Sequence, residues 1–275
     1  MALLTCQRSV IMQPDAIALS PSLEPYRARI EATLAPYVQI DVHPSDTTLP
    51  WESKFGGTPY LPKAIEYPKS AGGGYLHLLA QLNFADIPPL DAFPERGILQ
   101  IFIDASDDLY GLNFDTPTDQ SRFRMCYFPE VNTAIEKLVT RFDFLPEPEY
   151  HPINGAYSLS FSHRSAPVSP EDYRFNQLMG SDFDDLLEDE ACYDEYWELS
   201  RCEGHKIGGY PSFTQSDPRC SLPKIDSPDV LLLQIDTDEI HDIMWGDAGV
   251  GNFFISARDL QRLDFSRTLY SWDCA

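Results

Sequence analysis

Apolar residues recur at helical spacing in one stretch near the start of the chain. Within residues 20–38, Tyr26, Ile30, Leu34 and Tyr37 fall on one face of a helix. This pattern predicts an amphipathic helix over 20–38. From residue 39 onward, prolines and glycines interrupt the chain at short intervals, which is typical of turns and short strands rather than long helices.

Short apolar runs bounded by turn residues follow this first segment. They are rich in aromatic and branched side chains, as β-strands are. We expect strands at 76–82, 97–103, 122–128, 230–236, 252–256 and 267–272. The pattern therefore predicts a mainly β fold with some α, of the α+β class.

The segment at about 169–200 has a different character. Residues 169–172 read Ser-Pro-Glu-Asp, which is typical of a helix start, because serine caps the end, proline fits the first turn and acids favour the positive end of the helix dipole. Residues 182–198 then carry nine carboxylates among aromatic and aliphatic side chains. We expect a helical acidic insert over about 169–200.

Two stretches of the chain resemble one another. Each contains a Gly-Gly-x-Pro element, a Leu-Leu-x-Gln element, a strand that begins with glycine and an Asp-Leu-x-x-Leu-x-Phe element. These elements begin at Gly56, Leu78, Gly97 and Asp108 in the first stretch, and at Gly208, Leu231, Gly251 and Asp259 in the second. We therefore expect two similar β-rich halves, at about 50–130 and 203–274, within a single domain over residues 1–275.

Four residues are candidates for binding a ligand. Gln81 and Gln234 occupy matching places in apolar strands, so their amides either hold the backbone or contact a ligand. Trp245 and Asp247 lie in a glycine-rich segment without a counterpart in the first stretch, which either forms a tight hairpin or lets the backbone approach a ligand.

Together these motifs resemble the YwqG-like bacterial family. The resemblance rests on residues 205–211, 231–236, 244–249 and 253–255, and on residues 56–59 and 79–83 in the first half, so that it covers roughly 45–275. It implies a β-rich roll with a few helices. The family has no established function, so the resemblance supplies no catalytic residues.

The charge balance narrows the plausible partners. The chain has 20 Lys and Arg against 43 Asp and Glu, a formal net charge of −23. Such a surface repels phosphate backbones and anionic bilayers and attracts basic proteins. We expect no binding to nucleic acid or membrane. The lack of an apolar leader or spanning segment and the scattered cysteines (Cys6, Cys126, Cys192, Cys202, Cys220 and Cys274) predict a cytoplasmic protein with reduced thiols.

Motifs for nucleophiles, phosphate loops and metal sites are missing from the sequence. The aspartates of 236–247 do not match a calcium loop, because His241 stands where the loop needs glycine. Cys202 and His205 have the spacing of half a zinc site, without a second half. We therefore expect no metal, no cofactor and no enzymatic activity.

The leading hypothesis is a non-catalytic protein-binding module that contacts a basic protein, such as a toxin that it neutralises. The acidic insert supplies carboxylates and aromatic anchors for this contact: Asp184, Asp185, Glu188, Asp189, Tyr193, Tyr196 and Trp197. The same run also fits a solvated helix face. The alternatives are a structural domain without a ligand, and an enzyme or small-ligand sensor with a pocket between the β halves and acid/base candidates at Asp236, Asp238 and Asp247.

Overall fold

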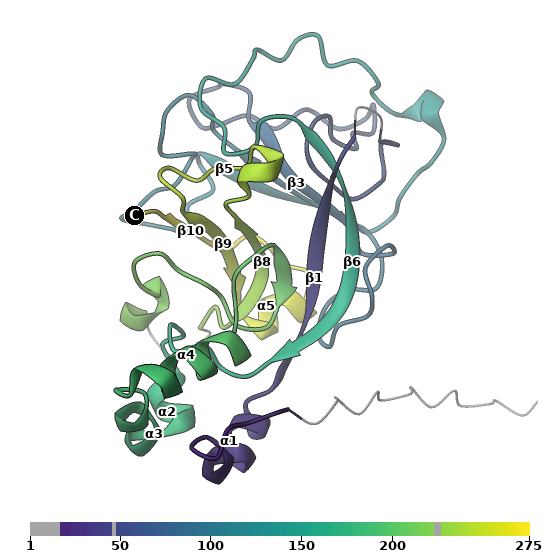
Figure 1. Ribbon diagram of the computed structural model, residues 1–275. Helices are drawn as coiled ribbons and strands as arrows, with labels where there is room; N and C mark the ends of the chain where they lie inside the picture. Colours follow the sequence, from purple (N-terminus) through teal and green to yellow (C-terminus); the bar gives the residue numbers. More distant parts are fainter. Residues whose placement is uncertain (1–16, 46–47, 223–226) are drawn as a thin grey trace, which may run out of the picture.

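The computed structural model describes residues 17–45, 48–222 and 227–275. It is mostly β, with ten antiparallel strands in one sheet in the order β10-β9-β8-β7-β1-β6-β2-β3-β4-β5. The sheet curls into a half-barrel, and β1 and β6 are its longest, most curved strands (Figure 1). The strands are β1 (Ala35–Pro44), β2 (Lys54–Gly56), β3 (His77–Asn83), β4 (Ile98–Ile103), β5 (Phe123–Phe128), β6 (Ala156–Ala166), β7 (Lys206–Gly208), β8 (Val230–Asp236), β9 (Val250–Ile255) and β10 (Leu269–Asp273).

The helices of the described residues are short. The α-helices are α1 (Arg27–Ala32), α2 (Phe175–Met179), α3 (Ser181–Leu186), α4 (Glu190–Leu199) and α5 (Ala257–Gln261), and the 3₁₀ turns are η1 (Glu24–Tyr26), η2 (Ile135–Lys137), η3 (Pro218–Ser221) and η4 (Glu239–His241). Helices α1 to α4 gather at one end of the sheet (Figure 1), around a shared apolar cluster that includes Ile30, Phe183 and Tyr196. No helix in the described ranges has the length and hydropathy needed to cross a bilayer.

The central ribbon of the sheet is the antiparallel pair β1 and β6, in which Ile40 lies opposite Phe161. In β1, Val38, Ile40 and Val42 alternate with more exposed residues and join the main core inside the half-barrel. This alternation is what a strand with one buried face requires.

On each side of this ribbon lies a flank of four strands. The N-terminal flank, β2 to β5, follows β6, and the C-terminal flank, β7 to β10, follows β1. Each flank has a register shift in its second strand, between Leu78 and Ala80 in β3 and between Leu231 and Leu233 in β8. The matching sequence elements therefore lie at matching places, counted outward from the ribbon.

The predicted strands at 76–82, 97–103, 122–128, 230–236, 252–256 and 267–272 are confirmed as β3, β4, β5, β8, β9 and β10, with small differences at their ends. The structure also explains Gly56, the first glycine of the Gly-Gly-x-Pro element in the N-terminal flank. Gly56 has φ +61°, and a Cβ there would lie 2.2 Å from the carbonyl oxygen of Gly155. A side chain at this position would therefore clash with backbone that cannot easily move.

The helix predicted over 20–38 is wrong beyond its middle. Helical structure covers only Glu24–Ala32, and β1 begins at Ala35. Pro36 disfavours helical backbone at the residue before it and lacks the N–H that a helix interior needs. Tyr37 consequently belongs to the strand, where it pairs with Gly208.

The acidic insert is helical, but its first helix begins later than predicted. The Ser169 hydroxyl accepts a hydrogen bond from Glu171 N, which forms a local turn, and α2 begins only at Phe175. The Asp172 carboxylate forms ion pairs with Arg174 and Arg219, in addition to accepting a hydrogen bond from the backbone N–H of Arg174. The residues between Ser169 and α2 are thereby free to build the site described below.

Candidate functional site

Gln81 holds the backbone on both sides of β2. Its Oε1 accepts a hydrogen bond from Tyr60 N at 2.7 Å, and its Nε2 donates to the carbonyl oxygens of Pro50 and Glu52, both at 2.8 Å. The side chain is fully buried. Gln81 therefore holds the backbone and has no free group for a ligand.

Gln234 makes the same set of contacts in the other flank. Its Oε1 accepts from Ser212 N, and its Nε2 donates to the carbonyl oxygens of Cys202 and Gly204, each at 2.8 Å. It is fully buried as well. The two glutamines lie in separate flanks, so the structure does not bring them together, and we do not retain them as ligand-binding residues.

The structure places Trp245 in the core and Asp247 at the surface. Trp245 is fully buried, packs edge to face on Tyr110 with ring centres 5.6 Å apart, and lies against Gly251. Asp247 is exposed on a tight turn that Gly249 N closes by donating to the Trp245 carbonyl oxygen. The glycines therefore serve a turn and a close ring contact, and Trp245 is a core residue in this structure.

An open cavity of about 680 Å³ lies on the acidic insert, where α3 and α4 face the loop after β7. Six carboxylates line it, and among the described residues of its wall there is no lysine or arginine. They are Glu171, Asp172, Asp184, Asp185, Glu188 and Asp217. The apolar and aromatic part of the wall includes Tyr173, Phe175, Leu187, Tyr193 and Phe213.

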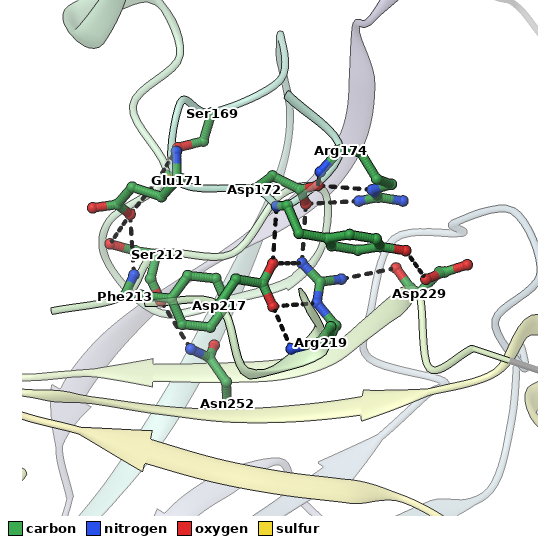
Figure 2. Close-up of polar contacts among 12 residues, drawn as sticks. Ser169, Glu171, Asp172, Arg174, Ser212, Phe213, Asp217, Arg219, Asp229 and Asn252 are labelled. Atoms are coloured by element: carbon green, nitrogen blue, oxygen red, sulfur yellow. Dashed lines mark hydrogen bonds and ion pairs between the residues drawn. The ribbon is translucent and has the colours of Figure 1, made fainter. Parts of the chain in front are cut away.

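A buried arginine holds the two walls of this cavity together. Arg219 is 1% exposed; its Nη2 donates to Asp217 Oδ2 at 2.7 Å and to Asp172 Oδ2 at 3.0 Å (Figure 2). Its guanidinium carbon lies 5.0 Å from the ring centre of Tyr173 and 4.4 Å from that of Phe254. Arg219 thus joins the start of the insert to the loop after β7 and to the outer face of β9.

Asp172 stays ionised within this network. Burial raises the pKa of Asp172, but the hydrogen bond from Arg174 and the positive charges of Arg219 and Arg174 outweigh burial and hold that pKa below its ordinary value. Arg174 binds the carboxylate through two nitrogens, each at 2.8 Å. The charge of Asp172 is therefore neutralised internally, so that the carboxylates nearer the surface dominate the field in the cavity.

Glu171 behaves in the opposite way. Burial raises the pKa of Glu171, although its Oε2 accepts hydrogen bonds from Phe213 N at 3.0 Å and from the Ser212 hydroxyl at 3.3 Å. Figure 2 shows the other carboxylate oxygen pointing away from these donors. A positive charge placed in the cavity near Glu171 would stabilise its ionised form.

Most of the predicted partner-binding residues surround this cavity. Asp184, Asp185, Glu188 and Tyr193 line it, and Trp197 stacks on Tyr193 with ring centres 5.9 Å apart. Asp189 follows Glu188 in the sequence and caps α4 by accepting a hydrogen bond from Cys192 N.

Tyr196 is different and requires a correction. Its side chain is fully buried in the cluster that joins α1 to α4, and its hydroxyl donates to the Val168 carbonyl oxygen at 2.8 Å. It packs the insert together, and it cannot reach a partner.

The arrangement is suited to binding cations. Carboxylates and the faces of aromatic rings both attract ammonium and guanidinium groups. Among the described residues no three His, Cys, Asp or Glu side chains are close enough to hold a metal ion, and the five described cysteines are free thiols; Cys6 lies outside the described residues.

The acid/base candidates of the enzyme hypothesis are divided between two places. Asp236 and Asp238 line a second cavity beside β1, whereas Asp247 lies on the turn before β9. A catalytic role for them stays a prediction.

The internal network of the site was not predicted from the sequence. Glu171 and Asp172 looked like the first turn of a helix, and Asp217 and Arg219 belong to no motif. They meet because two loops separated by about forty residues cover the same face of the C-terminal flank. The one usable signal was the dense run of carboxylates and aromatic residues in 182–198.

Comparison with known proteins identifies a family for the chain. No curated protein matches the chain. A family model does match residues 53–274, which is more than half of the chain and includes both flanks and the insert. The chain therefore belongs to the family described as domain of unknown function (DUF1963).

Proposed function

We propose that this chain is a YwqG-like member of the family and acts in the cytoplasm as a non-catalytic protein-binding module. Its acidic insert binds a basic protein, as an immunity-type protein would bind a basic toxin in order to neutralise it. The observation that carries the proposal is the cavity lined by six carboxylates and four aromatic rings, with no basic residue among the described residues of its wall.

The two flanks support a scaffold role for the β-sheet. We interpret them as repeats of one β unit, because Gln81 and Gln234 make the same three kinds of hydrogen bond and lie in strands at matching places. The insert is the part that breaks this correspondence. A repeated scaffold with one added surface is typical of a module that presents the added surface to a partner.

The chemistry of the surface favours a basic partner. The carboxylates of Asp184, Asp185 and Glu188 are exposed, so they attract a partner over a distance and raise its association rate. Tyr193, 40% exposed and stacked on Trp197, offers an aromatic anchor beside them. A lysine or arginine of the partner would enter the cavity between these groups.

The enzyme or sensor alternative requires a pocket between the two flanks. A cavity of about 660 Å³ is lined by residues of both flanks, from Ala92 to Arg96 on one side and by Leu260, Gln261 and Leu263 on the other. Its charged wall residues are Glu95 and Arg96. One carboxylate beside one arginine is not the pair of carboxylates that the acid/base hypothesis needs.

The test compares two double variants with the same change in net charge. Asp184→Lys with Glu188→Lys reverses the charge at the cavity, and Glu66→Lys with Asp91→Lys reverses two exposed acids elsewhere. The partner is first captured from host lysate at low salt and identified by mass spectrometry, and its affinity is then measured by calorimetry. We expect the cavity variant to bind about tenfold or more weakly, and the control variant to bind within about twofold of the original chain.

Equal affinities of the two double variants would contradict the proposal, because the partner would then respond to net charge and not to this surface. Binding that does not weaken between low and moderate salt would contradict it as well.

A further inference from the structure

The cavity beside β1 that Asp236 and Asp238 line has a volume of about 590 Å³. Strand β7 pairs with β1 only from Tyr37 to Gln39, and Ile40 N then donates to the His205 carbonyl oxygen at 2.9 Å. Past this point the cavity follows β1 from Gln39 to Val42, and its opposite wall is the segment 236–241. This part of β1 therefore borders an open cleft and not another strand.

His205 lies in the wall of this cleft, with its Nε2 near the Asp238 carboxylate. The residue is 5% exposed and lines the cavity. Its Nδ1 accepts a hydrogen bond from Asp236 N at 3.0 Å, while its Nε2 lies 3.7 Å from Asp238 Oδ2, which is longer than a hydrogen bond.

The protonation of His205 identifies Nε2 as the donor. Burial lowers the pKa of His205 to about 4, so the ring is neutral near pH 7. Since Nδ1 accepts, the single ring proton is on Nε2.

The rim of the cleft is acidic. Asp41, Glu203, Asp236, Asp238 and Glu239 line it. The one arginine in the wall, Arg201, is already paired with Glu203 at 3.0 Å. Basic side chains of a ligand would meet carboxylates from three segments of the chain.

A rigid turn presents an apolar side chain at the mouth of the cleft. Ile240 is 90% exposed, the highest value among the large hydrophobic residues described. Its turn is clamped by the Asp238 carboxylate, which accepts from Ile240 N at 3.1 Å and from His241 Nδ1 at 2.6 Å, and by the Tyr157 hydroxyl, which donates to the His241 carbonyl oxygen. An isoleucine held rigidly in water is preorganised for contact with another surface.

We propose that this cleft binds an extended basic peptide segment of a partner protein alongside β1. The donor on His205 Nε2 meets a peptide carbonyl, the carboxylates bind lysine or arginine side chains, and Ile240 packs on an apolar residue of the segment. Since side chains alternate along an extended peptide, one face of the segment carries its charges and the other its apolar residues. The site is separate from the acidic insert and does not depend on the function proposed for it.

The probe is a six-residue peptide of alternating lysine and valine, labelled with fluorescein, and the control peptide has glutamate in place of lysine. Binding to the full chain is measured by fluorescence anisotropy, and the site is mapped from amide chemical shifts. We expect the lysine peptide to bind, the glutamate peptide not to bind, and the shifts to cluster at Val42, His205 and Ile240.

Two variants and two controls locate the site. Ile240→Asp and Glu203→Lys change exposed residues of the cleft, and each is expected to weaken binding about tenfold. Ile65→Asp is the matched control, since Ile65 is 48% exposed on the other flank. The double variant at Asp184 and Glu188 tests whether the peptide occupies the insert instead.

The proposal is overturned if Ile240→Asp binds the lysine peptide as well as Ile65→Asp does. It is also overturned if the original chain does not bind the peptide at about 1 mM, or if only the double variant at Asp184 and Glu188 loses binding. The last result would leave the function proposed for the insert intact, so the two proposals fail separately.

Discussion

The two flanks of the sheet use the same internal framework and cover it in different ways. In each flank a buried lysine at the start of the first strand, Lys54 or Lys206, lies opposite the glutamine of the second strand. In the N-terminal flank, Gln100 Nε2 donates both to the Tyr60 carbonyl oxygen and to Gln81 Oε1, at 2.7 and 2.8 Å. The cover of this flank is held mainly by apolar and aromatic residues, such as Tyr60 packed on Phe128.

The C-terminal flank has a polar cover. Asn252 stands opposite Gln234 and donates to the Ser212 carbonyl oxygen, but its Oδ1 lacks a hydrogen-bond partner within the described residues. The covering insert is attached through Arg219 and its carboxylates, and a cavity lies beside this attachment. The strands and glutamines therefore provide the scaffold, whereas the segments laid over the outer face of the C-terminal flank form the wall of the cavity.

The largest effect should come from removing the attachment that exists in one flank alone. Arg219→Met leaves Asp217 buried without its main partner and Asp172 without one of its two arginines, so we expect a loss of about 3–5 kcal/mol in the free energy of unfolding. Urea unfolding followed by circular dichroism measures this loss.

The control is Arg141→Met, because Arg141 and Asp143 form an ion pair that is mostly exposed. We expect that variant to change stability by about 0.5 kcal/mol or less. A loss for Arg219→Met that is no greater than the control would mean that the polar cover does not stabilise its flank.

The matching glutamines test the shared part of the comparison. Gln81→Leu and Gln234→Leu each remove the partners of one backbone N–H and two carbonyl oxygens, and we expect each to lower the unfolding free energy by about 2–3 kcal/mol. Equal losses would support a common framework. The exposed Gln177, replaced by leucine, serves as the control.

Clearly unequal losses of unfolding free energy for the two glutamine variants would contradict a common framework. If only one glutamine substitution were destabilising, the similar hydrogen bonds would not be equally important, and the two flanks would differ in their framework as well as in their cover.

The sequence predicted the framework better than it predicted the cover. Short apolar runs predict strands such as β3 and β8. The similar sequence elements of the two stretches point to both glutamines. Strand β6 carries Tyr157, Leu159 and Phe161 at alternate positions, which is the pattern of a strand with one apolar face. The sequence predicts helix where β1 begins, because the first residues of β1 also fit a helical period.

The site itself depends on contacts that a local pattern cannot contain. Asp172 and Arg219 are separated by 47 positions and meet only because the insert folds back over β9. The exposed carboxylates of 182–198 could be predicted to lie on a surface, since charged residues stay solvated. Which aromatic residues of that run remain exposed depends on packing, and Tyr196 is buried for that reason.

The smallest of these effects concerns the residue in front of each buried lysine. Ser53 Oγ accepts from Asn83 N at 2.9 Å in one flank, and His205 Nδ1 accepts from Asp236 N at 3.0 Å in the other. His205→Ser therefore gives the C-terminal flank the residue of its counterpart. The two groups differ in one respect that can be measured, because the histidine titrates and the serine does not.

The sign of the effect follows from the direction of the pKa change. Burial lowers the pKa of His205 from 6.5 to about 4, so the unfolded chain binds a proton more readily than the folded chain as the pH falls below 6.5. Stability from this group is complete above pH 6.5 and is lost as the pH falls toward 4. Between about pH 7.5 and about pH 5 we expect a loss of about 2 kcal/mol that His205→Ser does not show.

The measurement is urea unfolding at both pH values for the original chain, for His205→Ser and for His163→Ser, which removes an exposed histidine. The difference in pH dependence, and not the absolute stability, is compared, because the serine also leaves unfilled space. Burial lowers the pKa of His151 to about 4 as well, but His151 is present in all three proteins, so its effect cancels. Equal pH dependence in all three would show that His205 is not held neutral, and the donor assigned to its Nε2 would then lose its basis.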